Sequence, residues 1–491
     1  MSTAAPQPTT HHAKHRKTFL GQPPMLANLF SVELWERFSF YGMQIVVLLY
    51  MYFAVAEGGL GIDQDVAVGI IGAYGGLVYL STIVGAWVAD RLLGSERVLF
   101  YSGGMIMAGH IALAVVPGIA GVAVGLLLVG VGSGGLKANV TSLVGTLYAE
   151  GDDRRDAGFS IFYMGINIGA LLGPLLTGLT RTTLGFHYAF GLAAVGMGIG
   201  LTQYALTRKN LPPESGRVPD PLPRSRYPIV IGAAVVALVA ILLALITGLV
   251  TPSNLASVVV GVVIVATISY FVVILTSRHV NEVERRRVYS FIPMFIASAA
   301  FWSLFQQQFT VVALYADERL DRTLFGWTMP IEWVQSINPI FIIVMAGVFA
   351  ALWTKLGSRQ PGSPIKFAIG LTVMGLAFLV FIPFAGGGPN STPLVAILFI
   401  LFLFTVAELS LSPVGLSLAT KLAPEAFLTQ MVALFFLSIA LGSAMAGVLA
   451  GYYDPTDEVP YFGFVGGTAI VLGLALAAAS RPITRLMSGV R

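Results

Sequence analysis

The chain has 491 residues, of which 56% are hydrophobic and only 11% are charged. Soluble domains carry about 25% charged residues, so this chain lacks the charges needed to cover a water-facing surface. The composition therefore predicts a polytopic membrane protein. The absence of cysteine excludes disulfides, thiol catalysis and cysteine-bound metals. The net charge of +4 reflects basic loops, and no nucleic-acid-binding pattern accompanies it.

Fourteen segments are long and apolar enough to form membrane-spanning helices, since a span needs about 20 apolar residues. In chain order they lie near 28–54, 68–90, 98–117, 120–141, 157–180, 187–207, 228–250, 255–277, 289–315, 333–354, 366–385, 393–419, 428–450 and 460–480. Basic residues cluster in alternate loops, and the remaining loops hold acids. The positive-inside rule then places both termini in the cytoplasm, which requires an even number of spans.

Two breaks in composition divide the chain. A proline-rich polar loop near 208–228 is typical of a linker, and with the later basic run RHVNEVERRR it isolates a helical pair at about 228–277. The other twelve spans divide six and six, as in transporters that bind substrate between two halves. The first 25 residues are polar and lack the apolar core of a signal peptide. The predicted units are a cytoplasmic tail (1–25), a six-helix bundle (26–208), a linker with two additional helices (209–288), a second six-helix bundle (289–482) and a cytoplasmic tail (483–491).

Few ionisable residues lie deep within the predicted spans. The first span contains ELWERFSFYG, residues 33–42, in which spacings of three and four bring polar side chains onto one helix face. This stripe consists of Glu33, Glu36, Arg37 and Tyr41. Charges in hydrocarbon pair with one another or face water, so we expect Lys137 of the fourth span to approach the stripe.

That pairing leaves Glu408, late in the second half, without a partner. We therefore expect a bipolar pocket, with one cationic wall at Arg37 and Lys137 and one anionic wall at Glu408. A small zwitterion fits such a pocket, and two or three residues of extended chain span about 7–11 Å. The alternative is that these ions only join helices together.

The stripe also offers a proton site. Two carboxylates three residues apart in a poorly solvated place cannot both ionise cheaply, so Glu33 or Glu36 is expected to take up a proton from the acidic exterior. Protonation would release Arg37 or Lys137 to bind a substrate carboxylate. Each charge that crosses the membrane gains about 2.3 kcal/mol per 100 mV, which concentrates a solute about fiftyfold. No GxxxxGK[ST] loop is present, so an ATPase motor is not expected.

ELWERFSFYG resembles the ExxERFxYYG motif of the proton-dependent oligopeptide transporters (POT), a branch of the major facilitator superfamily. The resemblance extends to FSIFYMGINIGALLG (159–173), GAWVADRLLGSERV (85–98), VQSINPIFI (334–342) and ELSLSPVGLSLATKLAP (408–424). It implies an all-α major facilitator fold with two six-helix bundles, here with the two extra helices of bacterial members. It also implies a proton-coupled symporter that imports di- and tripeptides by alternating access across the bacterial inner membrane.

The resemblance further implies a role for each matching residue. Arg37 and Lys137 would bind the peptide carboxylate, and Glu408, with Asn338 and Asn167, would bind the amine. Proton coupling would involve Glu33, Glu36, Arg37 and Lys137. The pocket would be lined by Tyr41, Tyr79, Trp302, Gln306, Ser412 and Phe435. Gating would involve Asp90 and Arg91, which are expected to latch the cytoplasmic side, and Pro413, at which the helix bends.

The sequence departs from the family pattern at several positions. The first tyrosine of the motif is Phe40, the usual proline after Lys137 is Ala138, and the tryptophan common on span eleven is Phe435. Gln306 stands where many relatives carry an acid on span seven. Because glutamine does not ionise, proton coupling should rest on the first and fourth spans.

Four alternatives remain: a same-fold transporter of nitrate, of an organic anion or of a drug, an uncoupled peptide facilitator, an exporter, and a receptor or scaffold. An anion has no amine to pair with Glu408, which argues against an anion transporter. Burying ions in both halves costs free energy and would bring no benefit to a receptor or scaffold. We expect no catalysis, no cofactor and no metal. The expected partners are di- and tripeptides, protons and membrane lipid, with no nucleic acid, and the protein is expected to be a monomer.

Overall fold

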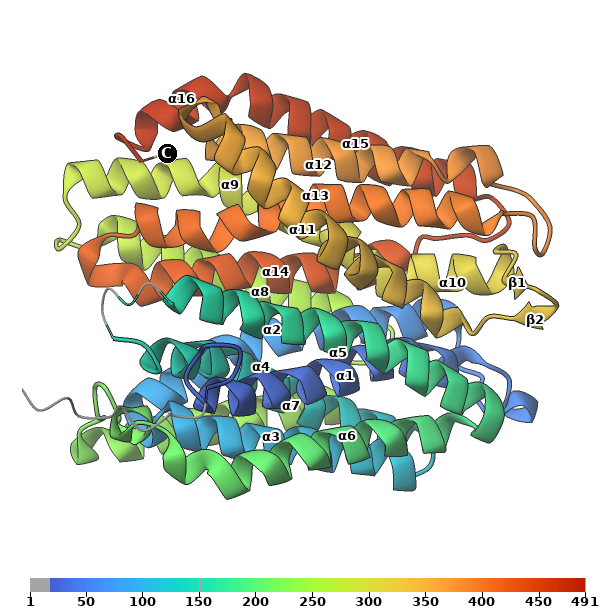
Figure 1. Cartoon of the computed structure of the whole chain (residues 1–491), viewed down its shortest axis with the longest axis horizontal. Coiled ribbons are helices and arrows are strands. Elements are labelled where there is room, and N and C mark those ends of the chain that lie inside the picture. Colours follow the sequence, from blue (N-terminus) through green and yellow to red (C-terminus); the bar gives the residue numbers. More distant parts are fainter. Residues whose placement is uncertain (1–17, 150–151, 153, 491) are drawn as a thin grey trace, which may run out of the picture.

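The chain folds into a bundle of long helices that run side by side (Figure 1). The computed structural model describes residues 18–149, 152 and 154–490, so most of the predicted N-terminal tail, residues 1–17, lies outside the described part. Both ends of the described chain lie at the same end of the molecule, which we call the terminal end. The opposite end, where α5 finishes and α11 begins, is called the distal end.

The helices follow the predicted order. The first bundle contains α1 (Met25–Tyr52), α2 (Gln64–Val88), α3 (Ser95–Val115), α4 (Gly118–Thr146), α5 (Arg155–Leu184) and α6 (Phe186–Thr207). The additional pair consists of α7 (Tyr227–Ile246) and α8 (Leu255–Thr276). The second bundle contains α9 (Glu282–Phe305), α10 (Val311–Glu318), α11 (Ile337–Leu356), α12 (Ser363–Leu379), α13 (Leu394–Leu422), α14 (Leu428–Ala450) and α15 (Glu458–Ala478), followed by the short α16 (Ser480–Leu486).

Thirteen helical segments among the described residues are long and apolar enough to cross a membrane. The helix α1 is not among them, although it is 28 residues long and runs along α5 and α6. Its charged stripe lowers its hydropathy, and its neighbours, rather than lipid, surround that stripe. Thirteen segments and α1 together give the fourteen predicted spans, in the major facilitator arrangement of two six-helix bundles and two extra helices.

Two predicted spans are less regular than the sequence suggested. The span predicted at 289–315 is interrupted, because α9 ends at Phe305 and a 3-10 turn (Gln306–Phe309) precedes α10. The span predicted at 333–354 starts as a 3-10 helix, Ile331–Ser336, before α11. Between the two lies a hairpin of β1 (Thr323–Leu324) and β2 (Trp327–Thr328), which the sequence analysis did not predict.

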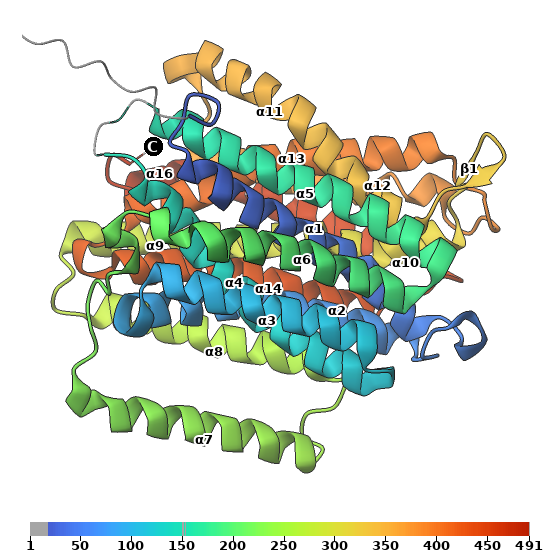
Figure 2. The same cartoon turned by 60° about the horizontal axis from the view of Figure 1, so that its bottom comes forward.

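The two additional helices pack very differently. The helix α8 lies against α2 of the first bundle and α14 of the second, and it buries Val263 and Ile274. In contrast, α7 buries none of its residues and stands apart from the other helices (Figure 2). Its apolar sequence, with no charge between Tyr227 and Ile246, suits a helix that lipid surrounds.

Small residues bring α1 and α5 into close contact, and this contact positions the charged stripe. A Cβ atom added at Gly169 of α5 would lie 2.8 Å from Cβ of Arg37 and 3.0 Å from the backbone nitrogen of Phe38. Helices in membranes approach closely where such small residues meet. Further along the same pair of helices, Thr177 of α5 donates its hydroxyl to the carbonyl oxygen of Gly42 of α1, 2.7 Å away.

The Gly169→Ala variant tests this contact. The added methyl group has no room between α1 and α5, so we expect it to destabilise the fold by about 1–3 kcal/mol and to lower the thermal unfolding midpoint of the detergent-purified protein. In the matched control, Gly104→Ala, the new methyl group meets no atom within 4 Å. Alanine is the better helix former, so the midpoint should stay the same or rise. Equal midpoints for the two variants would contradict the proposed packing.

Candidate functional site

The stripe on α1 forms a buried ion-pair cluster. The Arg37 guanidinium donates from Nε to Oε1 of Glu33 at 2.7 Å, and its Nη2 lies 2.6 Å from the same oxygen. Arg37 Nε also lies 3.4 Å from Oε2 of Glu36, which is close enough for an ion pair. The four-residue spacing of Glu33 and Arg37 allows this contact within a single helix.

Residues of α4 complete the cluster. The Lys137 ammonium donates to Oε1 of Glu36 at 3.2 Å, and the Ser133 hydroxyl donates to the same oxygen at 2.6 Å. The predicted approach of Lys137 to the stripe is therefore confirmed. Lys137 also lies 4.0 Å from the ring centroid of Phe40, so an aromatic face fills the place of the motif's first tyrosine.

The cluster balances two carboxylates against two cations and is almost sealed. The exposed fractions of the side chains are 1% for Glu33, 0% for Glu36, 11% for Arg37 and 8% for Lys137. Removing one partner from such a buried pair leaves an uncompensated charge, which is strongly unfavourable. The cluster can therefore exchange partners only if a proton or another charged group replaces the one that leaves.

Glu408 lies on α13 in the second bundle. Asn338 of α11 donates its amide to Oε2 of Glu408 at 3.5 Å and to the hydroxyl of Thr405 at 3.0 Å. Asn167 makes a different contact, since it donates to the backbone carbonyl of Tyr163 within α5 at 3.0 Å. The structure thus joins Asn338 to Glu408, whereas Asn167 is held within its own helix.

A cavity of about 1810 Å³ opens at the terminal end between the two bundles. It is lined by α5 on one side and by α11, α12, α13 and α16 on the other. Three of the predicted site residues line it, namely Asn167, Ser412 and Pro413. The ion-pair cluster and Glu408 do not line the cavity. The cavity therefore includes part of the predicted site but not its charged residues.

The other predicted pocket residues surround the space between the bundles. Tyr41 stacks on Phe309 of the 3-10 turn, with ring centroids 6.0 Å apart. Trp302 on α9 and Phe435 on α14 are buried, and Tyr79 on α2 is half-buried. Gln306 and Gln44 line a second cavity of about 10 Å³, which is the size of a single water molecule.

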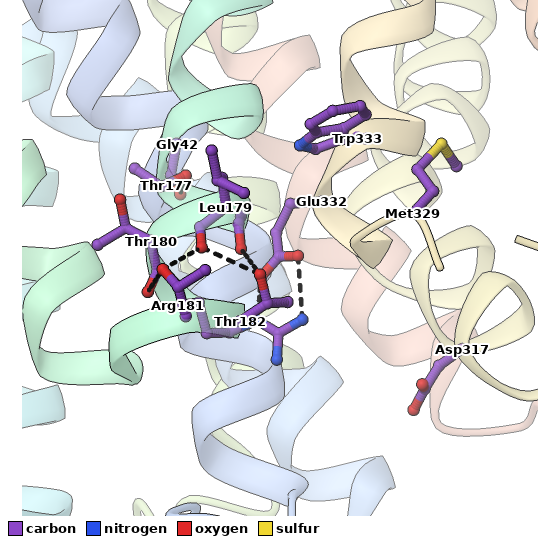
Figure 3. Close-up of polar contacts among 12 residues, drawn as sticks. Gly42, Thr177, Leu179, Thr180, Arg181, Thr182, Asp317, Met329, Glu332 and Trp333 are labelled. Atoms are coloured by element: carbon purple, nitrogen blue, oxygen red, sulfur yellow. Dashed lines mark hydrogen bonds and ion pairs between the residues drawn. The ribbon is translucent and has the colours of Figure 1, made fainter. Parts of the chain in front are cut away.

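Polar contacts close the distal end between the bundles. Figure 3 shows Arg181 of α5 paired with Glu332, which precedes α11, and Nη2 of Arg181 lies 3.2 Å from Oε2. Next to this pair, the Trp333 indole donates to the Leu175 carbonyl oxygen at 3.0 Å. The distal ends of α1 and α10 are joined by Tyr52, whose hydroxyl donates to Oδ2 of Asp317 at 2.6 Å.

The sequence analysis missed these distal contacts. Arg181 is one of the few bases in loops that otherwise hold acids, and this exception was a usable signal. Its partner Glu332 carried no such signal, because nothing in the local sequence indicates that its side chain is fully buried.

At the terminal end, the charged partner of Arg91 lies in the linker. Arg91 forms an ion pair with Asp220, and the backbone nitrogen of Leu222 donates to the carbonyl oxygen of Arg91 at 2.9 Å. Asp90 takes part through its backbone, since its carbonyl oxygen accepts from the nitrogen of Asp220 at 3.0 Å. These contacts attach the linker to the end of the first bundle.

Comparisons with known proteins agree on one family. The sequence pattern of the POT family matches residues 96–465. The transporter YclF of Bacillus subtilis is 44% identical over 479 residues, which cover 97% of each chain. A di-/tripeptide transporter of Lactococcus lactis is 39% identical, over 97% of this chain and 99% of that one. A crystal structure of a mutant peptide transporter POT in complex with alafosfalin matches with a TM-score of 0.91 and 47% identity, over 96% of this chain and 98% of the other.

The Arg181→Ala variant tests whether the distal pair holds that end closed. Its loss leaves the buried Glu332 carboxylate without its partner, at a cost of about 3–5 kcal/mol to the closed arrangement. The chain has no cysteine, so Ser443→Cys, at the small cavity, supplies a single buried thiol. We expect the variant to increase the maleimide-labelling rate of this thiol at least about tenfold.

The control for this experiment is Arg154→Ala, which removes an arginine from an exposed ion pair with Asp152 at the terminal end. It should leave the labelling rate unchanged, because exposed pairs contribute little. If Arg181→Ala also leaves the rate unchanged, the distal pair does not hold the closed arrangement.

Proposed function

This chain belongs to the POT family, and we propose that it is a proton-coupled symporter that imports di- and tripeptides by alternating access. The observation that carries the proposal is the buried cluster on α1 and α4, in which every charge already has a partner. The Lactococcus lactis relative is named a di-/tripeptide transporter, which supports the same substrate class. The proposed location is the bacterial inner membrane, with both termini in the cytoplasm.

In the proposed mechanism, a proton takes the place of one cation in the cluster. When Glu33 or Glu36 is protonated from the acidic exterior, it no longer compensates Arg37 or Lys137. The released cation then binds the carboxylate of an incoming peptide. Loss of the proton to the cytoplasm restores the internal pairs and displaces the peptide. The 2.6 Å and 3.2 Å contacts of the cluster correspond to the restored state.

The amine of the peptide is proposed to bind the second bundle. Glu408 has no cationic partner among the described residues, and its one side-chain hydrogen bond there comes from the Asn338 amide. An ammonium group would supply the missing charge, with Asn338 and the cavity-lining Asn167 as additional polar contacts. This requirement disfavours nitrate and simple organic anions as substrates, because they carry no amine.

The remaining predicted residues receive proposed roles in shape and movement. Tyr41, Tyr79, Trp302, Gln306, Ser412 and Phe435 would line the pocket around the peptide. Residues 26–208 and 289–482 would rock against each other, with 209–288 as the connection. Asp90, Arg91 and Pro413 would act in gating at the terminal end. The distal contacts and the terminal cavity support an inward-facing arrangement. Transport is proposed to need no catalysis and no cofactor, and one copy of the chain is proposed to suffice.

Uptake by proteoliposomes tests proton coupling. When the outside is made acidic, vesicles containing the protein should accumulate dialanine against its gradient, because the pH gradient and membrane potential drive protons inward. We expect Lys137→Ala and Glu33→Gln to abolish this accumulation. Lys209→Ala removes an exposed linker lysine and should retain uptake. Absence of accumulation in the unmodified protein would overturn the proposal.

A second experiment tests the amine contact. The unmodified protein should prefer dialanine to N-acetyl-dialanine at least about tenfold, since a hydrogen bond to a charged group contributes about 1.5–3 kcal/mol. Glu408→Gln should remove most of this preference in competition uptake assays, whereas Glu425→Gln, at an exposed glutamate near the end of α13, should retain it. If Glu408→Gln keeps the full preference, another residue binds the amine.

A further inference from the structure

The terminal cavity carries a concentration of positive charge that the proposed transport cycle does not use. Four basic side chains line it, and no Asp or Glu appears among the described residues that do so. These residues are Lys366, Lys421, Arg481 and Arg485, and we call them the cationic rim. They lie at the start of α12, at the end of α13 and on α16, so three separate elements bring them together.

The packing of α16 directs its arginines toward the cavity. Ile483 and Met487 are buried, which fixes one side of this segment against the second bundle, where α16 contacts α9 and α12. Arg481 and Arg485 are four residues apart and therefore share the other side. Figure 1 shows α16 at the terminal end of the second bundle. The packing of α16 thus fixes the backbone positions from which the two arginines line the cavity.

The rim is separate from the proposed peptide site. Lys421 lies thirteen residues after Glu408 on the same helix, which corresponds to about 20 Å along the helix axis. On α12, Lys366 donates to the Gln360 side chain at 2.9 Å and lies 4.3 Å from the ring centroid of Trp353. This tryptophan, near the end of α11, also lines the cavity, as expected for an aromatic residue at the membrane–water interface.

The wall beneath the rim is apolar. On α11 the lining residues include Ile342, Ile343, Phe349 and Ala350. The helix α11 buries little of its surface, and Val344, next to Ile343 of this wall, is exposed, as expected of a side chain that faces lipid. One cavity therefore combines a cationic edge at the membrane surface with an apolar wall at membrane depth.

We propose that the cationic rim binds the phosphate group of an anionic phospholipid from the cytoplasmic leaflet, with an acyl chain against the apolar wall of α11. Guanidinium groups bind phosphate through paired hydrogen bonds, and basic pockets between helices on this side of a membrane are suited to anionic headgroups. A soluble phosphate would use the rim alone, and the apolar wall beneath it favours the lipid. This site does not depend on which solute the protein transports.

Native mass spectrometry of the delipidated, detergent-purified chain tests the proposal. Titration with phosphatidylglycerol should give a bound lipid in preference to phosphatidylcholine. Each cation near an anionic headgroup contributes about fivefold to affinity, so Arg481→Gln/Arg485→Gln should weaken phosphatidylglycerol binding about 25-fold. The matched control, Arg224→Gln/Arg226→Gln, removes the same charge from exposed linker residues that do not line the cavity and should bind like the unmodified chain.

The other outcomes would overturn the proposal. Equal binding of the two double variants would mean that the rim is not the site, and equal binding of the two lipids would mean that no anion is recognised. Displacement of the lipid by excess inorganic phosphate would show that the rim takes the phosphate group alone. Thermal unfolding of both variants checks that each is folded, and Lys366→Gln, on a different element, provides a second variant that should weaken binding about fivefold.

Discussion

The contact between α1 and α4 is the interaction on which the rest of the site depends. Glu36 is fully buried and accepts hydrogen bonds from both Lys137 and Ser133, while Arg37 is paired with Glu33. Four ionised groups persist in a membrane protein because each has a partner of opposite charge. The same balance makes the cluster sensitive to one proton, since neutralising either carboxylate leaves Arg37 and Lys137 with a single carboxylate between them.

The fold supports this cluster by holding its helices at fixed, short separations. Gly169 of α5 allows α1 to approach until the backbone beside Arg37 is in contact with it. Between the bundles, however, the contacts are uneven, because Arg181 and Glu332 close the distal end while a cavity separates the terminal ends. A molecule with rigid halves and one closed end can change its access by exchanging which end is closed, which is the arrangement expected of a transporter.

Much of this architecture could be predicted from the sequence, because span length and helical spacing are local properties. The stripe on α1 and the approach of Lys137 followed from spacing and from the cost of an unpaired charge. The pairing of Arg181 with Glu332 depends on the distal end of α5 meeting the 3-10 segment before α11, and the 3-10 turn at Gln306 depends on packing between bundles. Of these residues, only Arg181 left a signal in the sequence, and nothing local indicates its partner or the turn. The predicted pocket around the charges also differs from the observed cavity, which Asn167 and Ser412 line, because access to the space between two bundles depends on their relative position.

The most direct test of the account is the number of protons taken up when a peptide binds. In a weakly buffered detergent solution near neutral pH, addition of dialanine to the purified chain should raise the pH, because a cation of the cluster becomes available only when Glu33 or Glu36 gains a proton. A variant in which both glutamates are replaced by glutamine should bind without this change. Peptide binding by the unmodified chain with no proton uptake at any pH would contradict the account.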